Sequence, residues 1–353
     1  MNFFVLLTAF IFSFVLTVPT IFLAKKVGLV TNKKTRYHPA HTHVGLIPRG
    51  GGLPIYLSFL LTSLIFLSLN KIVFGVLFSS FFLVFIGLLD DYFDLSPYLR
   101  FVANLIIAAI VVGFGLGIPY ISNPFGGIIR LDQWRLTFDF FGQRSILILA
   151  DLLAIIWLAW TTNMINWSKG VDGQLPGFVA VTAFFLGLLS QRFTIHDIST
   201  QTVTLLSFIV CGAFLGFLPF NFYPQKIMPG YGGGAFAGFI LGILSILSFG
   251  KLGTAILILA IPIIDAIYTI LRRMIKKKSP FRADWGHFHH KLLEIGWGRR
   301  RIAVFYWLVS FILGIASLFL KGPEKLIAFL SFFVILIVFI LIIEKVKKIK
   351  KIN

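Results

Sequence analysis

The sequence predicts an all-α, polytopic integral membrane protein with about eleven transmembrane helices. Of its 353 residues, 58% are hydrophobic and 41 are Phe, with a mean hydropathy of +0.94. Apolar runs long enough to cross a bilayer recur along the whole chain. The formal net charge is +19 although only 13% of residues are charged. The excess basic residues therefore belong to loops and do not form a nucleic-acid-binding face, so no nucleic acid partner is expected.

Runs of roughly 17 to 25 apolar residues define most of the expected spans, and the sixth is shorter. They are 3–24, 53–69, 72–89, 101–118, 146–162, 177–190, 200–218, 232–249, 253–271, 304–320 and 326–343. The first run lacks a basic leading segment and a small-residue cleavage site, so we expect a retained helix. Cys211 is the single cysteine, which leaves no disulfide within one chain. No repeat or soluble domain is visible, so residues 1–353 are expected to form one transmembrane domain.

The distribution of basic residues predicts the orientation in the membrane. Alternate loops together with the C-terminal tail carry 24 of the 32 Lys and Arg residues. By the positive-inside rule this side is cytoplasmic, the N-terminus is outside and the C-terminus is inside, in the plasma membrane. The tail after residue 343 is expected to contact anionic lipid. The cytoplasmic loops expected to form the active face are 25–52, 90–100, 163–176, 219–231 and 272–303. On the other side, 128–141 alternates apolar and polar residues and predicts a small hairpin.

The residues on which the interpretation centres follow the third apolar run. Asp90, Asp91 and Asp94 lie beside the membrane, and Asp90 and Asp94 would share a face if the helix continues. Charged groups at a bilayer need a partner, such as a divalent cation, a cationic substrate pocket or water. Arg100 could hold an anion beside them. A solvated interfacial loop is the plain alternative.

Two further cytoplasmic loops carry glycine and polar residues. The first contains the run Pro48 to Gly52, with Arg49 inside it, and glycines let a backbone approach phosphate closely. A plain hinge explains such a run equally well. The histidines before it are more simply solvated than ligands; they are His38, His41 and His43. In the third loop Asn163 and Asn166 lie one turn apart, and helix capping is the alternative for either. Asp172 lies between two glycines in a tight turn.

The last two cytoplasmic loops add an aromatic residue, an intramembrane acid and a histidine cluster. Asn221, Lys226 and Tyr231 are the polar members of the fourth loop. Asp265, within the ninth run, is a functional candidate by default, and pairing with Arg272 is the alternative. The fifth loop brings together histidines and cations: Arg282, Asp284, His287, His289, His290 and Lys291. Its H-x-H-H spacing resembles a metal site, but the dense cations favour contact with a pyrophosphate. The combined set suits phosphoryl transfer, in which carboxylates hold a divalent cation and basic groups neutralise phosphate.

These motifs resemble those of the polyprenyl-phosphate N-acetylhexosamine-1-phosphate transferases over nearly the whole chain. The matching segments, in order, are PRGGG, DDYFDLSPYLRF, NMINWSKGVDG, LGFLPFNF and SPFRADWGHFHHKLLEIG. The histidine motif favours the branch that uses UDP-N-acetylglucosamine (UDP-GlcNAc) and undecaprenyl phosphate. The resemblance implies transfer of sugar phosphate from the UDP-sugar to the polyprenyl phosphate, with release of UMP and with Mg²⁺, or Mn²⁺, as cofactor. The product would initiate cell-wall, lipopolysaccharide or teichoic acid synthesis, and a homodimer is left open.

The resemblance also implies residue roles. Asp90 and Asp91 match the catalytic acidic pair and candidate metal ligands, and Asp94 is assigned to the same catalytic cluster. The residues assigned to substrate binding are Arg49, Arg100, Asn163, Asn166, Asp172, Arg282, His287, His289, His290 and Lys291. Two positions depart from the family pattern, because Lys169 and Tyr231 stand where aspartates are usual. Tyrosine is a poor magnesium ligand.

The two departures leave three functions open. The first is the transferase, with Lys169 replacing part of the metal's role. The second is a relative that binds UDP-sugar or polyprenyl phosphate without turnover. The third is a transporter, which only the number of spans and Asp265 suggest, and the chain lacks the paired broken spans of repeat-built transporters.

Overall fold

The computed structural model describes residues 2–31, 45–123, 126–139, 143–192, 198–248, 252–279 and 285–352. The predictions for His38, His41, His43, Arg282 and Asp284 lie outside these residues. The described part is mostly helical, which confirms an all-α polytopic membrane protein in its coarse form.

The helices follow the apolar runs of the sequence. They are α1 (Asn2–Lys26), α2 (Gly52–Phe66), α3 (Lys71–Phe93), α4 (Pro97–Gly113), α5 (Ile148–Trp167), α6 (Gln174–Gln191), α7 (Ile198–Asn221), α8 (Gly230–Leu247), α9 (Leu252–Ile258), α10 (Ala260–Ile275), α11 (Phe288–Glu294), α12 (Arg299–Phe319) and α13 (Gly322–Ile352). The ninth apolar run is divided between α9 and α10, which are bent by 77° at Leu259. The short helix α11 carries the histidine cluster.

In the described ranges, eight helices are long and apolar enough to cross a membrane, or nine with the bent pair α9 and α10. Two more apolar helices, α2 and α4, are shorter, with 15 and 17 residues. The chain is therefore polytopic, and the count of eleven spans and the orientation remain predictions.

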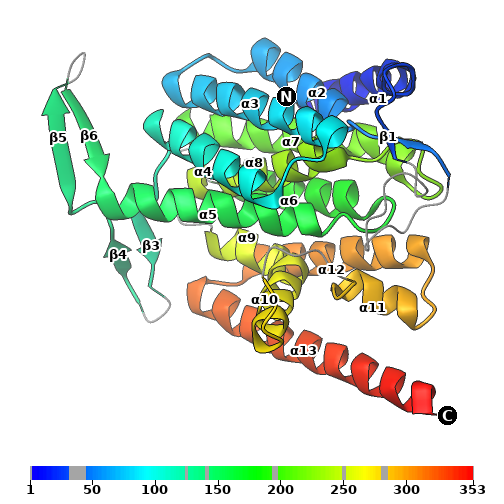
Figure 1. The fold of residues 1–353 in the computed structure, drawn as a ribbon. Coiled ribbons are helices and arrows are strands. Elements are labelled where there is room, and N and C mark those ends of the chain that lie inside the picture. The colour runs from blue at the N-terminus through cyan, green and yellow to red at the C-terminus, as the bar shows by residue number, and fades with distance from the viewer. Residues whose placement is uncertain are drawn as a thin grey trace.

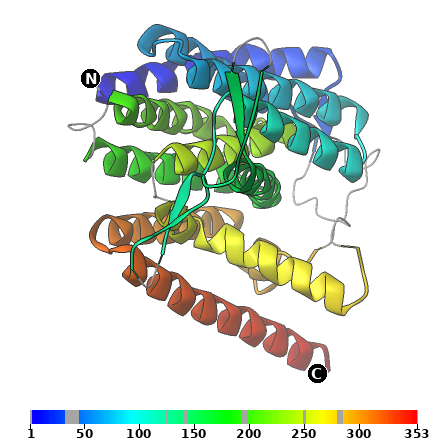
Figure 2. The ribbon, with the colours of Figure 1, turned by 90° about the vertical axis from the view of Figure 1, so that its left-hand side faces the viewer.

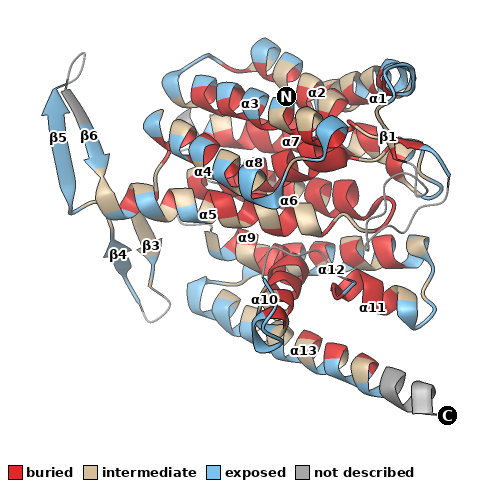
Figure 3. Ribbon diagram, viewed as in Figure 1, coloured by how far each residue is buried: buried red, intermediate tan, exposed pale blue. Residues whose placement is uncertain are grey.

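The helices are stacked in layers around a buried centre. α1, α2 and α3 lie on one side of α7 and α8, and α9 to α13 lie beyond α5 and α6 on the other (Figures 1 and 2). Burial is concentrated in α6, α7 and α8, whereas α13 and the strands at the far end are largely exposed (Figure 3). The central helix α8 contacts α2, α3, α5, α6, α7 and α9.

Glycines allow α8 to pack at backbone distance against α3. A Cβ atom at Gly87 of α3 would lie 2.2 Å from the Cα atom of Gly232 in α8. At Gly52 of α2, a Cβ atom would lie 2.4 Å from the backbone nitrogen of Gly233. Small residues at helix interfaces permit this approach within a membrane, where lipid tails are as apolar as the side chains they would replace. The start of α8 is thereby fixed beside the end of α3.

The turn between α3 and α4 is set by local sequence. Asp94 ends α3 in the left-handed conformation with φ 55°, and its N–H donates to the carbonyl of Asp90 at 2.8 Å. Ser96 then caps α4 by accepting from the N–H of Leu99 at 3.2 Å, with Pro97 in the first turn. Arg100 consequently lies one turn into α4. The expectation that Asp90 and Asp94 share a helix face is wrong, because the helix ends before Asp94, whose side chain is exposed.

Three two-stranded antiparallel sheets complete the described structure. β1 (Val30–Thr31) pairs with β2 (Ile47–Pro48), β3 (Tyr120–Ser122) with β4 (Ile128–Arg130), and β5 (Arg135–Asp139) with β6 (Gln143–Leu147). The last two hairpins project from the start of α5, at the end opposite α11 (Figure 1). A single hairpin within 128–141 is therefore wrong, because β4 and β5 each pair with a strand outside that segment.

The close contact of α3 and α8 predicts that Gly87→Ala destabilises the protein. Its new methyl group would overlap the backbone of Gly232, which a side-chain movement cannot relieve, and overpacking of this kind costs about 1–3 kcal/mol. Thermal unfolding of the purified protein in detergent should show a lower Tm. Gly113→Ala is the matched control, because a Cβ atom at Gly113 of α4 has nothing within 4 Å. Equal Tm values for the two variants would contradict the packing argument.

Candidate functional site

Two buried carboxylates form the centre of the site, at the end of α3. Asp90 and Asp91 are each 1% exposed. The Nε of Arg49, which follows β2, lies 3.4 Å from Asp91 Oδ1. Arg100 NH1 lies 3.3 Å from Asp90 Oδ2. The structure thus brings together four of the predicted site residues, and pairing with guanidinium groups offsets the cost of burying the carboxylates.

The first turn of α8 completes the pocket around Asp91. The backbone N–H of Tyr231 donates to Asp91 Oδ1 at 3.0 Å. Gly230 has φ +70°, and a Cβ atom there would lie 1.9 Å from Asp91 Oδ2, so only glycine fits this position. Free N–H groups and the dipole at a helix start favour a negative charge. The glycine run of the fourth loop therefore makes room for a carboxylate of the protein itself, that of Asp91.

Lys169 reaches the same centre from the loop between α5 and α6. Its Nζ donates to Asn166 Oδ1 and to the carbonyl of Gly230, both at 2.6 Å. Burial lowers the pKa of Lys169 to about 8, and the charge of Asp91 opposes the shift. The ammonium form is thus the main form at neutral pH. Asn166 contacts the centre through this lysine.

Tyr231 is held between two cations. Its ring centroid is 5.1 Å from Arg100 Cζ and 5.7 Å from Lys169 Nζ, within the range of cation–π attraction. Its hydroxyl lies 2.9 Å from Asn104 Nδ2, and the same hydroxyl lies 3.2 Å from Asn104 Oδ1. Asn104 was missed by the sequence reasoning, although a buried amide within an apolar helix is a signal that a partner exists.

The histidine cluster forms a second group of contacts. His287 Nδ1 lies 2.9 Å from Asp265 Oδ2, and the N–H of Phe288 donates to Asp265 Oδ1 at 2.7 Å. Asp265 therefore anchors the start of α11, and these contacts differ from the pairing with Arg272 that was the alternative. Burial lowers the pKa of His289 well below its usual value, with the neighbouring histidines acting in the same direction. His289 is neutral at physiological pH.

His290 and Lys291 have contacts within the protein. The ring of His290 stacks on Trp285 with the ring centroids 3.9 Å apart. Lys291 forms an ion pair with Glu344 of α13, and its Nζ lies 5.3 Å from the centroid of the Tyr268 ring. The charge of Lys291 is thus largely balanced before any ligand binds.

Asp172 lies in a third group of contacts. Gln225 Nε2 donates to Asp172 Oδ1 at 2.9 Å, and Arg299 NH1 lies 3.6 Å from Asp172 Oδ2. Burial raises the pKa of Asp172, and Arg299 opposes the shift. Asn163, by contrast, donates to the carbonyl of Ala159 at 2.8 Å within its own helix. This contact lies within α5, which ends at Trp167, so it is not the helix capping that was the alternative for this asparagine.

The loop from Ser168 to Gly173 links the three groups. Lys169 reaches the carboxylates, and Asp172 reaches Gln225 and Arg299. Between them, a Cβ atom at Gly170 would lie 1.9 Å from His289 Nε2, so the loop touches the histidine cluster where any larger residue would collide. One short loop thus connects sites that are far apart in the sequence.

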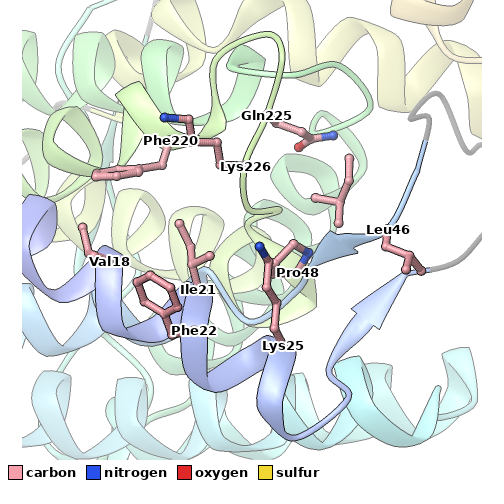
Figure 4. Close-up of a pocket in the computed structure, with 10 residues that line it drawn as sticks. Val18, Ile21, Phe22, Lys25, Leu46, Pro48, Phe220, Gln225 and Lys226 are labelled. Atoms are coloured by element: carbon pink, nitrogen blue, oxygen red, sulfur yellow. The ribbon is translucent and has the colours of Figure 1, made fainter.

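A cavity borders the site without containing a predicted site residue. It has a volume of about 410 Å³ and lies between the end of α1, β2 and the segment after α7 (Figure 4). Lys25 and Lys226 supply basic groups to an otherwise largely apolar lining. Pro48 in its wall precedes Arg49, and Gln225 in its wall donates to Asp172.

The donor set does not fit a resident divalent cation. Among the described residues there is no group of three or more His, Cys, Asp or Glu side chains arranged for a metal ion. Asp90 and Asp91 remain, with Asp90 Oδ1 buried and without a hydrogen-bond partner in the described part of the chain. Mg²⁺ can use two carboxylates together with substrate phosphates. Here, however, three cationic side chains already surround the pair.

The position of Lys169 predicts that it titrates near pH 8. Pulse acetylation at a series of pH values, followed by mass spectrometry, should show half-maximal reactivity of Lys169 near pH 8, against a usual lysine pKa of about 10.4. Asp91→Asn should lower the pKa of Lys169 further, because the charge of Asp91 favours the ammonium. Titration of Lys169 near pH 10 in the unmodified protein would contradict its burial at the centre.

Comparison with known proteins places this geometry in a family. Residues 73–249 match the family described as glycosyl transferase family 4. The chain is 31% identical over 322 residues to a probable undecaprenyl-phosphate N-acetylglucosaminyl 1-phosphate transferase of Bacillus subtilis (strain 168), covering 89% of this chain and 82% of the relative. It is 30% identical over 308 residues to an undecaprenyl-phosphate alpha-N-acetylglucosaminyl 1-phosphate transferase of Escherichia coli (strain K12), covering 82% and 76%.

A third relative carries a related name. The chain is 27% identical over 353 residues to the decaprenyl-phosphate N-acetylglucosaminephosphotransferase of Mycobacterium tuberculosis (strain CDC 1551 / Oshkosh), covering 90% of this chain and 82% of the relative. The family match spans the carboxylates of α3, the loop with Lys169 and the glycine-rich start of α8. The chain belongs to glycosyl transferase family 4.

Proposed function

We propose that the protein transfers N-acetylglucosamine-1-phosphate from UDP-GlcNAc to undecaprenyl phosphate, or to another polyprenyl phosphate, and releases UMP. One observation carries the proposal: a buried carboxylate pair, flanked by Arg49, Arg100 and Lys169, lies at the end of apolar helices. Relatives that match most of the chain are named for this transfer.

The chemistry needs charge stabilisation more than covalent catalysis. An oxygen of the acceptor phosphate attacks the β-phosphorus of UDP-GlcNAc and forms a new phosphorus–oxygen bond. The bond from the β-phosphorus to the bridging oxygen breaks, its electron pair stays on that oxygen, and UMP leaves. Negative charge gathers on phosphate oxygens, which fixed cations stabilise. Arg49, Arg100 and Lys169 are the side chains placed for this role.

The nucleotide end of the substrate is assigned to the loop from Ser168 to Gly173 and to α11. Neutral His289 can donate one hydrogen bond through its ring, and the absence of a side chain at Gly170 leaves room for that ring against the loop. Asp90, Asp91 and Asp94 keep their predicted catalytic assignment. Asp94 is exposed at the end of α3, where it can meet a ligand from the water side.

Lys169 and Tyr231 also favour a second candidate, a relative that binds UDP-sugar or polyprenyl phosphate without turnover. Both residues replace aspartates of the family pattern, and both lie at the carboxylate centre. A chain with this change could retain the binding surface and lose the reaction. The two candidates differ in one observable, the lipid product.

The transferase proposal predicts a lipid-linked sugar phosphate from purified protein. The reaction contains UDP-GlcNAc and undecaprenyl phosphate, with and without Mg²⁺, because the magnesium or manganese requirement implied by the resemblance is itself untested. We expect UMP and lipid product in equal amounts. Asp91→Asn should lower the rate by about 10²-fold or more, because the centre loses a charge that positions its cations. UDP-GlcNAc binding without any lipid product would support the second candidate.

We expect eleven membrane spans, with the active face on the cytoplasmic side of the plasma membrane. A Cys211→Ala background should receive single cysteines by Lys226→Cys and Thr137→Cys, both at exposed positions. A membrane-impermeant maleimide added to intact cells should label Cys at 137 and leave 226 unlabelled until the cells are permeabilised. The reverse pattern would invert the orientation. The polymer built from the product and a homodimer remain predictions that this labelling does not address.

A further inference from the structure

The carbonyl oxygens near the carboxylates are already occupied by an ammonium. A divalent cation such as Mg²⁺ needs about six oxygen ligands in a compact shell. Asn166 Oδ1 and the carbonyl of Gly230 are neutral oxygens at this centre, and both accept from Lys169 Nζ at 2.6 Å. The lysine thus takes up oxygens that a metal ion would require.

The carboxylates are themselves paired. Asp91 Oδ1 accepts from the Tyr231 N–H at 3.0 Å and lies 3.4 Å from Arg49 Nε. Asp90 Oδ2 lies 3.3 Å from Arg100 NH1. Ion pairs at this depth hold their partners in place, because removal of one leaves an uncompensated buried charge. A metal ion bound to Asp91 Oδ1 or Asp90 Oδ2 would have to displace these guanidinium groups, whereas Asp90 Oδ1 has no hydrogen-bond partner in the described part of the chain.

The local charge is balanced without a metal. Arg49, Arg100 and Lys169 match Asp90 and Asp91 together with the exposed Asp94. A divalent cation would add a net charge of about +2 within reach of an ammonium, in a partly buried environment where repulsion is weakly screened.

Tyr231 suits a lysine partner and not a metal ion. Its ring faces Lys169 Nζ and Arg100 Cζ at 5.7 and 5.1 Å from the centroid. Relative to the aspartates that the resemblance implies at these positions, lysine at 169 changes the local charge by +2 and tyrosine at 231 by +1. The combined change is of the same sign and of similar size to the charge that Mg²⁺ would bring.

We propose that the Lys169 ammonium, held by Asn166, Gly230 and the Tyr231 ring, takes the place of a divalent cation, so that this centre binds the diphosphate of a nucleotide sugar without a metal. The identity of that ligand rests on the proposed function. The part of the proposal that concerns the metal does not rest on the proposed function, because it is argued from the contacts at the centre.

The first arm of the test measures metal binding alone. The purified full-length protein is titrated with Mn²⁺ and followed by electron paramagnetic resonance. We expect no stoichiometric site in the unmodified protein. The double variant Lys169→Asp/Tyr231→Asp should gain one Mn²⁺ that Mg²⁺ displaces, whereas Lys276→Asp/Lys278→Ala, which makes the same change in charge at exposed positions, should gain none. One Mn²⁺ bound by the unmodified protein and lost in Asp91→Asn overturns the proposal.

The second arm measures ligand binding. Calorimetric titration with UDP-GlcNAc should give the same Kd, within about threefold, in Mg²⁺ and in EDTA. A Kd that rises about tenfold or more in EDTA overturns the proposal. If UDP-GlcNAc binds in neither buffer, the proposed function fails, and the Mn²⁺ titration of the unmodified protein still decides the metal question even where the double variant does not fold.

Discussion

The hydrogen bond from the Tyr231 N–H to Asp91 connects the fold to the site. It requires the first turn of α8 to meet the last turn of α3, and a Cβ atom at Gly87 or at Gly230 would prevent this approach. With α8 in this place, the carbonyl of Gly230 is positioned for Lys169 and the Tyr231 ring for Arg100. A backbone contact between two membrane helices therefore fixes the electrostatics of the centre.

The loop between α5 and α6 connects the carboxylate centre to the other two groups of the site. Lys169 is held at one end by the carboxylate centre, and Asp172 at the other by Gln225 and Arg299. Gly170 fits against His289, which in turn depends on α11 and its anchor Asp265. These contacts are with α8, α11, α12 and the segment between α7 and α8, so a movement of the loop would change all three groups at once. Coupled groups of this kind suit a ligand with several charged parts.

Much of the fold was predictable because helices in a membrane must satisfy their backbone internally, so long apolar runs become helices. The hydropathy of a segment does not show where its helix changes direction, so the 77° bend at Leu259 could not be predicted from it. The early end of α3 depends on the left-handed conformation of Asp94, which a run of three acids does not reveal. Asp90 and Asp91 were found because buried acids beside a bilayer need partners. The partners of Asp265 and Lys291, which are His287 and Glu344, lie on other segments and needed the structure.

In the sequence, Lys169 and Tyr231 look like two independent replacements of the aspartates that the resemblance implies. In the structure their side chains are in contact, so each residue can be explained by the other. If aspartate remained at 169, its carboxylate would approach the negative face of the Tyr231 ring and be repelled by it. If aspartate remained at 231, Lys169 would pair with it directly, and the ammonium would be drawn away from Asn166 and Gly230. Each residue therefore suits the pocket mainly when the other is present. The carboxylate centre is a self-consistent arrangement of paired charges, and this is the arrangement on which the proposal of metal-free phosphate binding depends.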